Sequence, residues 1–321
     1  MAGRGISNWS IAEIRRRFVD DGQPVSRYRL NQMKRDRRAG VRRIGAMLRR
    51  RLEEQRREAR RMQRIQRMER VLWGRGIQVV AGVDEAGVGP LAGPVVAAAV
   101  ALPCGLEIAS INDSKTLDEP TRLEMEEQIR KSALCYSVAA AGVEEIDRLN
   151  IYHAALLAMR RAVEGLDGQA QFVLTDARLI PDLERPPQRA LPKGDRNSIS
   201  VAAASILAKN HRDRLMVELD RRFPQYGFAS HKGYTTARHC RSIREHGLCP
   251  AHRRSFHVLA EIQGDFSPLF YRLRQALQEV QDLSALQAAA REISGHRGQL
   301  CESEKIRLRS MLARRRRCVK N

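Results

Sequence analysis

Residues 82–94 read GVDEAGVGPLAGP, and this stretch indicates how the chain folds. It follows the apolar run IQVVAG (77–82) and precedes the apolar run VVAAAVALP (95–103), so a β-strand is predicted on each side of a glycine-rich turn. Asp84 and Glu85 then lie where the first strand leaves the core. Two adjacent carboxylates in that position call for a chemical explanation.

Strand-like and helical segments alternate along the middle of the chain. Three sequential strands followed by alternating helix and strand predict an α/β fold, a mixed sheet flanked by helices. The predicted strands cover about 77–84, 93–102, 133–143 and 171–177, and the predicted helices cover about 120–131, 150–166, 198–221 and 234–246.

The composition changes twice and predicts three parts. Residues 1–75 form a basic helical extension, with a short helix after Ser10 and a long helix over about 41–73. The apolar stripe of the long helix is too thin to predict a core of its own. Residues 76–262 form the α/β domain, and residues 263–321 form a helical, partly mobile, basic appendix.

The net charge of +21 is concentrated at the two ends. Residues 1–75 carry 23 Lys and Arg against 8 Asp and Glu, and residues 301–321 carry 8 against 2, so the segment between them is neutral overall. Arginine dominates over lysine, and guanidinium groups bind phosphate through two hydrogen bonds. We therefore expect a nucleic-acid partner, although arginine-rich helices are also simply well solvated.

Secretion and membrane insertion are not expected, because no apolar run reaches the roughly 18 residues of a membrane span. The six cysteines include no C-x-x-C pair, which favours reduced thiols and a cytoplasmic location. The segment HCRSIREHGLCPAH (239–252) is rich in His and Cys, but its spacing matches no common zinc site.

Two further acids end or follow predicted strands. Asp176 ends the apolar segment FVLTD, and Asp195 lies in the turn LPKGDRNSIS. Carboxylates at strand ends of α/β sheets face ligands bound in the crevice beyond the sheet. Four acids gathered there repel one another unless cations lie between them, and hard oxygen ligands predict Mg²⁺ or Mn²⁺. Two such ions about 4 Å apart serve phosphodiester hydrolysis.

Structural explanations exist for the same residues. An isolated Asp in a turn, such as Asp195, is more often a helix cap than a ligand. Adjacent residues of a strand point to opposite faces, so Asp84 and Glu85 share a site only if the backbone turns out after them. Spacing alone therefore leaves a metal site and a purely structural role equally open.

Six blocks of the sequence together resemble ribonuclease HII. They are GVDEAGVGPLAGPVVAAAV, INDSKTL, NIYHA, KGDRNSISVAAASILAKNHRD, HKGYTTARH and CPAHRRSF, in the order and at about the intervals typical of that family. The resemblance covers residues 77–257, and the leader up to Trp73 is similar to the N-terminal extension of longer members. The segment after Gln263 has no obvious counterpart.

The resemblance implies a ribonuclease H-like fold and a metal-dependent endonuclease. Such enzymes cut the RNA strand of RNA·DNA hybrids, or cut duplex DNA on the 5′ side of an embedded ribonucleotide, leaving a 3′-hydroxyl and a 5′-phosphate. The family's four catalytic, metal-binding acids correspond to Asp84, Glu85, Asp176 and Asp195, and two Mg²⁺ or Mn²⁺ ions per site are implied.

The resemblance also implies substrate-binding residues. Tyr234 matches the tyrosine that packs on the sugar at the junction between ribonucleotide and deoxyribonucleotide, although a tyrosine in such a loop is as often a packing residue. Lys115, Ser205 and Lys209 lie in matching blocks and are candidates for phosphate contacts, and Lys209 is equally explained as a surface charge.

The turn departs from the family pattern at one residue. The family usually has Gly-Arg-Gly where this chain has Gly87, Val88 and Gly89. The family reads the 2′-hydroxyl largely through backbone groups of this turn, which valine retains, but the arginine's phosphate contact is lost. A β-branched residue also resists positive φ. We expect a weakened or retuned enzyme rather than an inactive one.

Two other functions fit parts of the sequence. A non-catalytic or weakened binder of hybrids or junctions would explain Val88 and the basic ends, but it has no need of four mutually repelling acids. A metal-dependent nuclease for another substrate, such as branched DNA, is less consistent with the tyrosine block.

One short segment suggests a protein partner. QGDFSPLF (263–270) loosely resembles a peptide that docks on sliding clamps, with Gln263, Phe266, Leu269 and Phe270 as anchors. Such patterns often arise by chance, and the start of an amphipathic helix explains the same residues.

Overall fold

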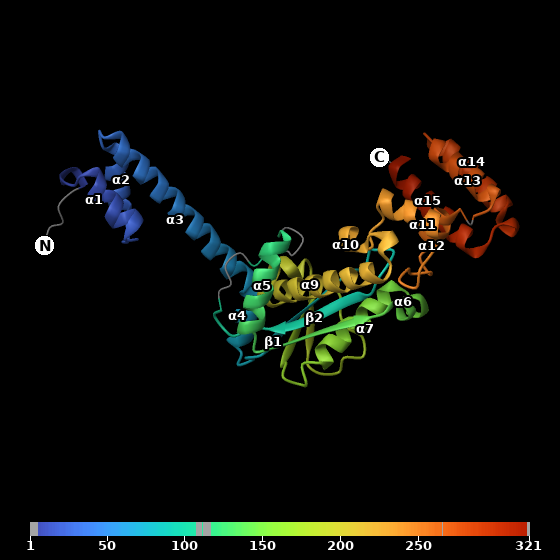
Figure 1. Ribbon diagram of the computed structural model, residues 1–321, viewed down its shortest axis with the longest axis horizontal. Helices are drawn as coiled ribbons and strands as arrows, with labels where there is room; N and C mark the ends of the chain where they lie inside the picture. Colours follow the sequence, from blue (N-terminus) through green and yellow to red (C-terminus); the bar gives the residue numbers. More distant parts are fainter. Residues whose placement is uncertain (1–5, 107–110, 112–116, 265, 320–321) are drawn as a thin grey trace. The chain divides into compact units, whose positions relative to one another are not determined.

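The computed structural model describes residues 6–106, 111, 117–264 and 266–319. The chain divides into two compact units, Met1–Val71 and Leu72–Asn321, and each is described by itself (Figure 1).

The second unit is built on a mixed five-stranded sheet in the order β3-β2-β1-β4-β5. β1 pairs antiparallel with β2 and parallel with β4, β2 pairs antiparallel with β3, and β4 pairs parallel with β5. The predicted mixed α/β sheet is confirmed. The strands are Val80–Ala86 (β1), Val95–Ala101 (β2), Cys135–Ala141 (β3), Phe172–Asp176 (β4) and Gln188–Leu191 (β5), of which the last was not predicted.

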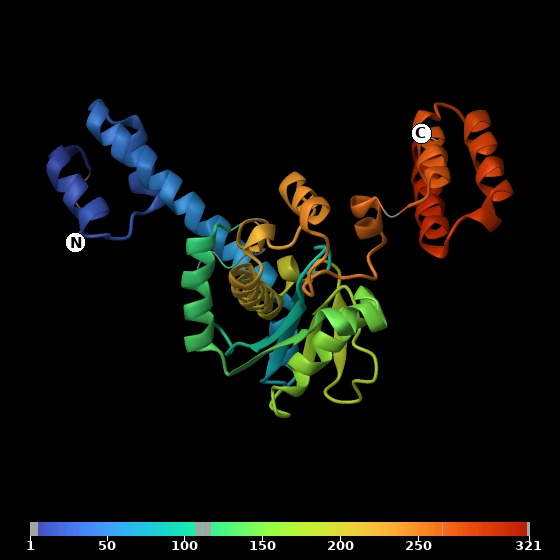
Figure 2. The same cartoon turned by 45° about the vertical axis from the view of Figure 1, so that its right-hand side comes forward.

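Two helices cover opposite faces of the sheet (Figures 1 and 2). α7 (Ile151–Glu164) packs on the face formed by alternate residues of β1 and β2, in one buried cluster that includes Ala81 and Val83. α9 (Ile199–Arg222) packs on the other face, where Gly82 lies directly against its backbone. Asp84 shares the face of Gly82, because strand residues alternate. The acid therefore points toward α9.

Shorter helices surround this sandwich. α5 (Glu119–Ser132) begins after Asp118, whose side chain caps the helix, with proline in the first turn as predicted. The others are Val143–Leu149 (α6), Gly194–Asn197 (α8), Phe228–His231 (α10), Ala237–His246 (α11) and His257–Gln263 (α12).

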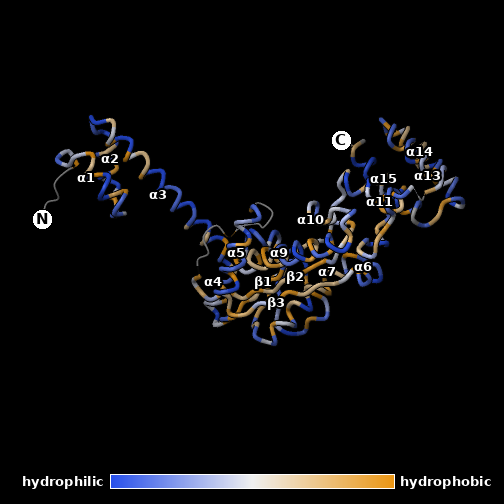
Figure 3. The backbone as a smooth tube through the Cα atoms, viewed as in Figure 1, coloured by the Kyte–Doolittle hydropathy of each residue, from blue (hydrophilic) through white to orange (hydrophobic). Residues whose placement is uncertain are grey.

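The first unit has a hydrophobic core of its own, and the prediction that its apolar stripe is too thin was wrong. Val41 and Leu48 of α3 (Ala39–Ile65) are joined by apolar side chains from the preceding helices: Ile6, Ile14, Phe18, Leu30 and Met33. Apart from that stripe, α3 is strongly hydrophilic (Figure 3).

The predicted start of this unit is confirmed, but two of its helices differ from the prediction. Ser10 and Glu13 form a reciprocal capping box at α1 (Ile11–Arg15), which continues as a π-helical segment over Arg16–Asp20. α2 (Arg27–Arg35) was not predicted. The predicted long helix is two helices: α3 ends at Ile65, with Gln66 as its C-cap, and α4 spans Arg67–Trp73.

The segment after Gln263 is helical in its described part, as predicted. α13 (Pro268–Glu279), α14 (Leu283–Gly295) and α15 (Glu302–Val319) share one apolar cluster. Phe266 and Phe270 are buried in that cluster. In this conformation the two aromatic anchors of the clamp-like peptide are therefore core residues of the helical segment.

Among the described residues, no helix is long and apolar enough to cross a membrane.

Candidate active site

The pairing of β1 with β4 brings two of the predicted acids together. The strands run parallel and Val83 lies opposite Thr175, so Asp84 and Asp176 are the next residues on neighbouring strands. Asp176 ends β4, and the carboxyl end of a parallel strand is where an α/β sheet presents ligand-binding groups.

Asp84 is the buried centre of this group of acids. Its side chain is 7% exposed. Burial raises the pKa of Asp84 well above its ordinary value, and the charges of Glu85 and Asp176 raise it further. A hydrogen bond with Ser205 of α9 and one from the Glu85 N–H, at 2.8 Å, act in the opposite direction. The carboxylates of Asp84, Glu85 and Asp176 therefore interact electrostatically.

Glu85 lies on the other side of the strand from Asp84. Its Oε1 is 3.5 Å from Nη1 of Arg178, whose guanidinium stacks 5.1 Å from the ring centre of Tyr152 on α7. β1 continues to Ala86, so the backbone does not turn out directly after Asp84. Arg178, which the sequence did not suggest, offsets part of the repulsion between the acids.

Asp195 is brought to the same edge through its neighbour Gly194. The Gly194 N–H donates to Asp176 Oδ1 at 2.6 Å, and a Cβ on Gly194 would lie 3.1 Å from the Asp176 Cα. Any larger residue at position 194 would force its neighbours to shift by a few tenths of an ångström, and Asp195 is the next residue in the chain. The cap of α9 is Ser198, so Asp195 is not the cap of that helix.

The donor set fits a hard divalent cation. All four candidate ligands are carboxylates, and the pKa of Asp84 is raised by burial and then by the charges of Glu85 and Asp176, which a cation would neutralise. Within the described ranges, no three His, Cys, Asp or Glu side chains already stand at metal-binding distances. Glu85 instead pairs with Arg178, and Asp176 accepts from Gly194. Side-chain rotation is thus needed to bring the four acids around an ion.

The glycine turn lies beside Tyr234. A Cβ on Gly89 would lie 3.7 Å from the Tyr234 ring, and the tyrosine is 49% exposed. The positive φ values of the turn fall on Gly87, at +96°, and on Gly93, at +83°, and not on Val88. Val88 is half-buried and packs against the core under α7. Val88 therefore causes none of the backbone strain that a β-branched residue would cause at a positive φ.

The candidate phosphate contacts lie in different environments. Ser205 is 6% exposed and hydrogen-bonds with Asp84, so its hydroxyl faces the acid and not the solvent. Lys209 Nζ is 2.6 Å from Asp213 Oδ1. Lys115 lies outside the described residues.

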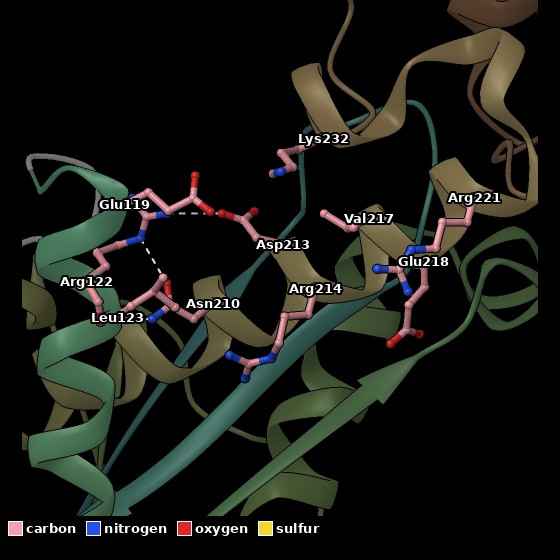
Figure 4. Close-up of a pocket in the computed structure, with 10 residues that line it drawn as sticks. All are labelled: Glu119, Arg122, Leu123, Asn210, Asp213, Arg214, Val217, Glu218, Arg221 and Lys232. Carbon is pink, nitrogen blue, oxygen red and sulfur yellow. Dashed lines mark hydrogen bonds and ion pairs between the residues drawn. The ribbon is translucent and has the colours of Figure 1, made fainter.

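A groove of about 280 Å³ lies between α5 and α9, lined mainly by charged residues (Figure 4). Arg122 is almost buried and donates to Asn210 Oδ1 at 3.0 Å and to Asp213 Oδ2 at 3.2 Å. Asp213 thereby links Arg122 to Lys209 and limits the movement of the lysine. None of the four candidate acids lines this groove.

The His- and Cys-rich segment forms a neutral hydrogen-bond chain. His252 Nδ1 accepts the Cys249 N–H at 3.0 Å, which leaves the ring proton on Nε2. That proton faces His239 Nε2 at 3.1 Å, so His239 carries its proton on Nδ1, 2.9 Å from the Tyr234 carbonyl oxygen. Both ring nitrogens of His239 and of His252 take part in these hydrogen bonds. This series of hydrogen bonds ends at the Tyr234 carbonyl oxygen and therefore supports the backbone of Tyr234.

Acid should weaken the fold through this pair. Burial lowers the pKa of both His239 and His252 to about 4, against about 6.5 in the unfolded chain. Because the unfolded chain binds protons at these rings more readily, the free energy of unfolding is highest above about pH 6.5. It decreases as the pH falls toward 4, by up to about 3 kcal/mol for each ring. Urea unfolding between pH 7.5 and 4.5 measures it. His252→Gln should flatten this dependence and exposed His153→Gln should not; equal slopes in all three proteins would contradict the assignment.

The sequence and the fold are similar to those of known proteins. The family model for ribonuclease HII matches residues 81–259, and that for the ribonuclease HII N-terminal domain matches residues 10–73. Ribonuclease HII of Myxococcus xanthus (strain DK1622) is 48% identical over 256 residues, 79% of this chain and 87% of the relative. Ribonuclease HII of Anaeromyxobacter sp. (strain Fw109-5) is 47% identical over 264 residues, 82% of this chain and 84% of the relative. The crystal structure of ribonuclease H2 from Pyrococcus horikoshii OT3 superimposes with a TM-score of 0.51 and 26% identity, covering 58% of this chain and 98% of that one.

Proposed function

The chain belongs to the ribonuclease HII family of metal-dependent endonucleases, and we propose that it cuts both RNA·DNA hybrids and duplex DNA that contains single ribonucleotides. The cut falls on the 5′ side of a ribonucleotide and leaves a 3′-hydroxyl and a 5′-phosphate. The observation that carries this proposal is the meeting of Asp84 and Asp176 on neighbouring parallel strands, with the pKa of Asp84 raised by burial and by its acidic neighbours.

We assign the catalytic metal site to Asp84, Glu85, Asp176 and Asp195, which would hold two Mg²⁺ or Mn²⁺ ions. Bound there, such ions would supply an acidified water and neutralise charge at the departing 3′-oxygen. The protein's part is to orient the ligands. Hydrogen bonds from Ser205 and the Glu85 N–H hold Asp84, and the Gly194 N–H holds Asp176.

The substrate contacts follow from the same arrangement. Tyr234 is exposed beside Gly89, so a sugar that rests on the ring also meets the backbone of the turn. Lys209, whose ammonium group pairs with Asp213, and Lys115 are proposed to contact substrate phosphates, on the ground of the sequence pattern. The basic segments 1–75 and 263–321 supply sequence-independent phosphate contacts in addition to those of the catalytic domain, residues 76–262.

Docking of residues 263–270 on a sliding clamp is a weaker proposal. Phe266 and Phe270 would have to leave the core around Leu273 before they entered a pocket on a partner. The amphipathic-helix interpretation accounts for the segment without that cost.

A panel of duplexes tests the proposed activity. Equal concentrations of RNA·DNA hybrid, duplex RNA, duplex DNA and duplex DNA with one ribonucleotide are incubated with Mg²⁺, Mn²⁺ or a chelator. We expect the hybrid and the ribonucleotide-containing duplex to be cut, and only with metal. Tight binding without cleavage in either metal would support the alternative of a non-catalytic binder.

Restoring arginine at position 88 should strengthen the enzyme. Val88→Arg adds a guanidinium that can bond a substrate phosphate, a contribution of about 1 to 3 kcal/mol. The gain should be seen in the substrate Kd and in kcat/KM. Val88→Met, which adds length without charge, is the matched control. If Val88→Arg leaves both affinity and rate at the wild-type values, the proposed cost of the valine is wrong.

A further inference from the structure

Arg253 is a completely buried arginine beneath the glycine turn. Its relative exposure is 0%, and burial lowers the pKa of its guanidinium to about 9. The guanidinium donates only to main-chain carbonyl oxygens of the turn. The acceptors are Gly87 at 2.6 Å, Pro90 at 2.8 Å, Gly93 at 2.9 Å, and Val88 and Pro94 at 3.2 Å each.

A second buried arginine, Arg212 of α9, supports the same turn. Its guanidinium donates to the carbonyl oxygens of Pro94 at 3.1 Å, Ala92 at 3.2 Å and Lys232 at 3.1 Å. It lies so close under Gly87 that a Cβ there would collide with it. Because Lys232 lies two residues before Tyr234, Arg212 also connects the turn to the segment that carries the tyrosine.

The two arginines decide which way the peptide groups of the turn face. In a trans peptide the N–H points away from the C=O. Because the carbonyls of Gly87 and Val88 point inward to Arg253, the N–H groups of Val88 and Gly89 point outward. Neither N–H has an acceptor among the described residues, whereas the N–H groups of Leu91 and Gly93 donate to other main-chain carbonyls of the unit.

We propose that Arg253, supported by Arg212, is the positioning residue that holds the Val88 and Gly89 N–H groups outward to bond the 2′-hydroxyl of a ribonucleotide. The inference rests on the proposed function. Selectivity for a ribonucleotide then depends on a buried side chain that never touches the substrate. It also explains how the turn keeps its shape with valine in place of arginine at position 88.

A lysine at position 253 cannot make the hydrogen bonds that the Arg253 guanidinium makes. An ammonium carries three donors on one atom, whereas the planar guanidinium carries five donors spread over three nitrogens. Arg253→Lys therefore leaves at least two of the five carbonyls without a partner and frees the turn. The neighbouring Arg254 is exposed, so Arg254→Lys is the matched control.

The test compares binding of a DNA duplex containing one ribonucleotide with binding of the same all-DNA duplex, in Ca²⁺ to avoid cleavage. We expect wild type and Arg254→Lys to prefer the ribonucleotide duplex, and Arg253→Lys to lose about tenfold of that preference with unchanged affinity for DNA. A correctly folded Arg253→Lys protein that keeps the full preference would overturn the inference.

A second variant tests the same inference if Arg253→Lys does not fold. The Asp147 carboxylate accepts from the N–H groups of Arg254 and Ser255, at 3.0 and 2.9 Å, and so anchors the segment that carries Arg253. Asp147→Ala should reduce the preference by a smaller factor, and an unchanged preference in this variant also counts against the inference. If wild type itself neither prefers nor cuts the ribonucleotide duplex, the proposed function fails instead.

Discussion

Replacing Asp84 by asparagine is expected to lower the cleavage rate by about 10³-fold or more, because the substitution removes a central charged ligand of the proposed ions. Asp84 is buried between Glu85 and Asp176, so no other acid can take its place. Binding of the uncut duplex should change little, since the basic ends and Tyr234 are untouched. Single-turnover cleavage and a separate Kd measurement distinguish the two effects.

The same variant should gain stability in the absence of metal. The asparagine side chain carries no charge, so the burial and repulsion that raise the pKa of Asp84 no longer oppose folding. In a chelator we expect the variant to melt a few degrees above wild type. Adding Mn²⁺ should raise the melting temperature of the variant by less than it raises that of wild type. Asp167→Asn, at an exposed position, is the matched control. Wild-type cleavage by Asp84→Asn would exclude the proposed site.

Replacing Gly82 by alanine should be among the most damaging single changes to the fold. The added Cβ would collide with the main chain of Ser200 and Val201 on α9. Neither a strand in the middle of the sheet nor the helix backbone can move without disturbing the core on both sides. We expect a loss of more than about 4 kcal/mol, which is a fall in melting temperature of roughly 10 °C or an insoluble protein.

Gly142→Ala provides the comparison. Gly142 has an ordinary φ of −74°, and the nearest atom to an added Cβ is a Glu145 side-chain oxygen at 4.0 Å. This variant should melt within about 2 °C of wild type. Equal melting temperatures for the two variants would mean that β1 and α9 are not packed as described, and Asp84 and Ser205 would then have no reason to meet.

The sheet and its acids were predictable because they depend on local patterns. The apolar run before Asp84 and the run that ends in Asp176 each mark a strand whatever lies around them, although β1 continues two residues beyond Asp84, to Ala86. β5 was missed because Gln188–Leu191 is a four-residue edge strand without apolar alternation. α2 was missed because it is polar except for Leu30 and Met33, which find their partners in other helices.

The supports of the site were not predictable, because they depend on contacts between distant residues. Arg253 reaches a turn about 160 positions earlier in the chain, and nothing in HRRSF separates the buried Arg253 from the exposed Arg254. Arg178 and Arg122 pair with acids on other elements in the same way. In a chain with so many arginines, only the fold shows which ones are interior groups.

Mapping the cut in a DNA duplex with one ribonucleotide tests the central claim most directly. The labelled strand is incubated with wild-type protein and Mg²⁺ or Mn²⁺, and the product ends are identified. We predict one cut on the 5′ side of the ribonucleotide, with a 3′-hydroxyl and a 5′-phosphate, that disappears in a chelator. Binding without any cut in either metal, or equal cutting of the all-DNA duplex, would contradict the account.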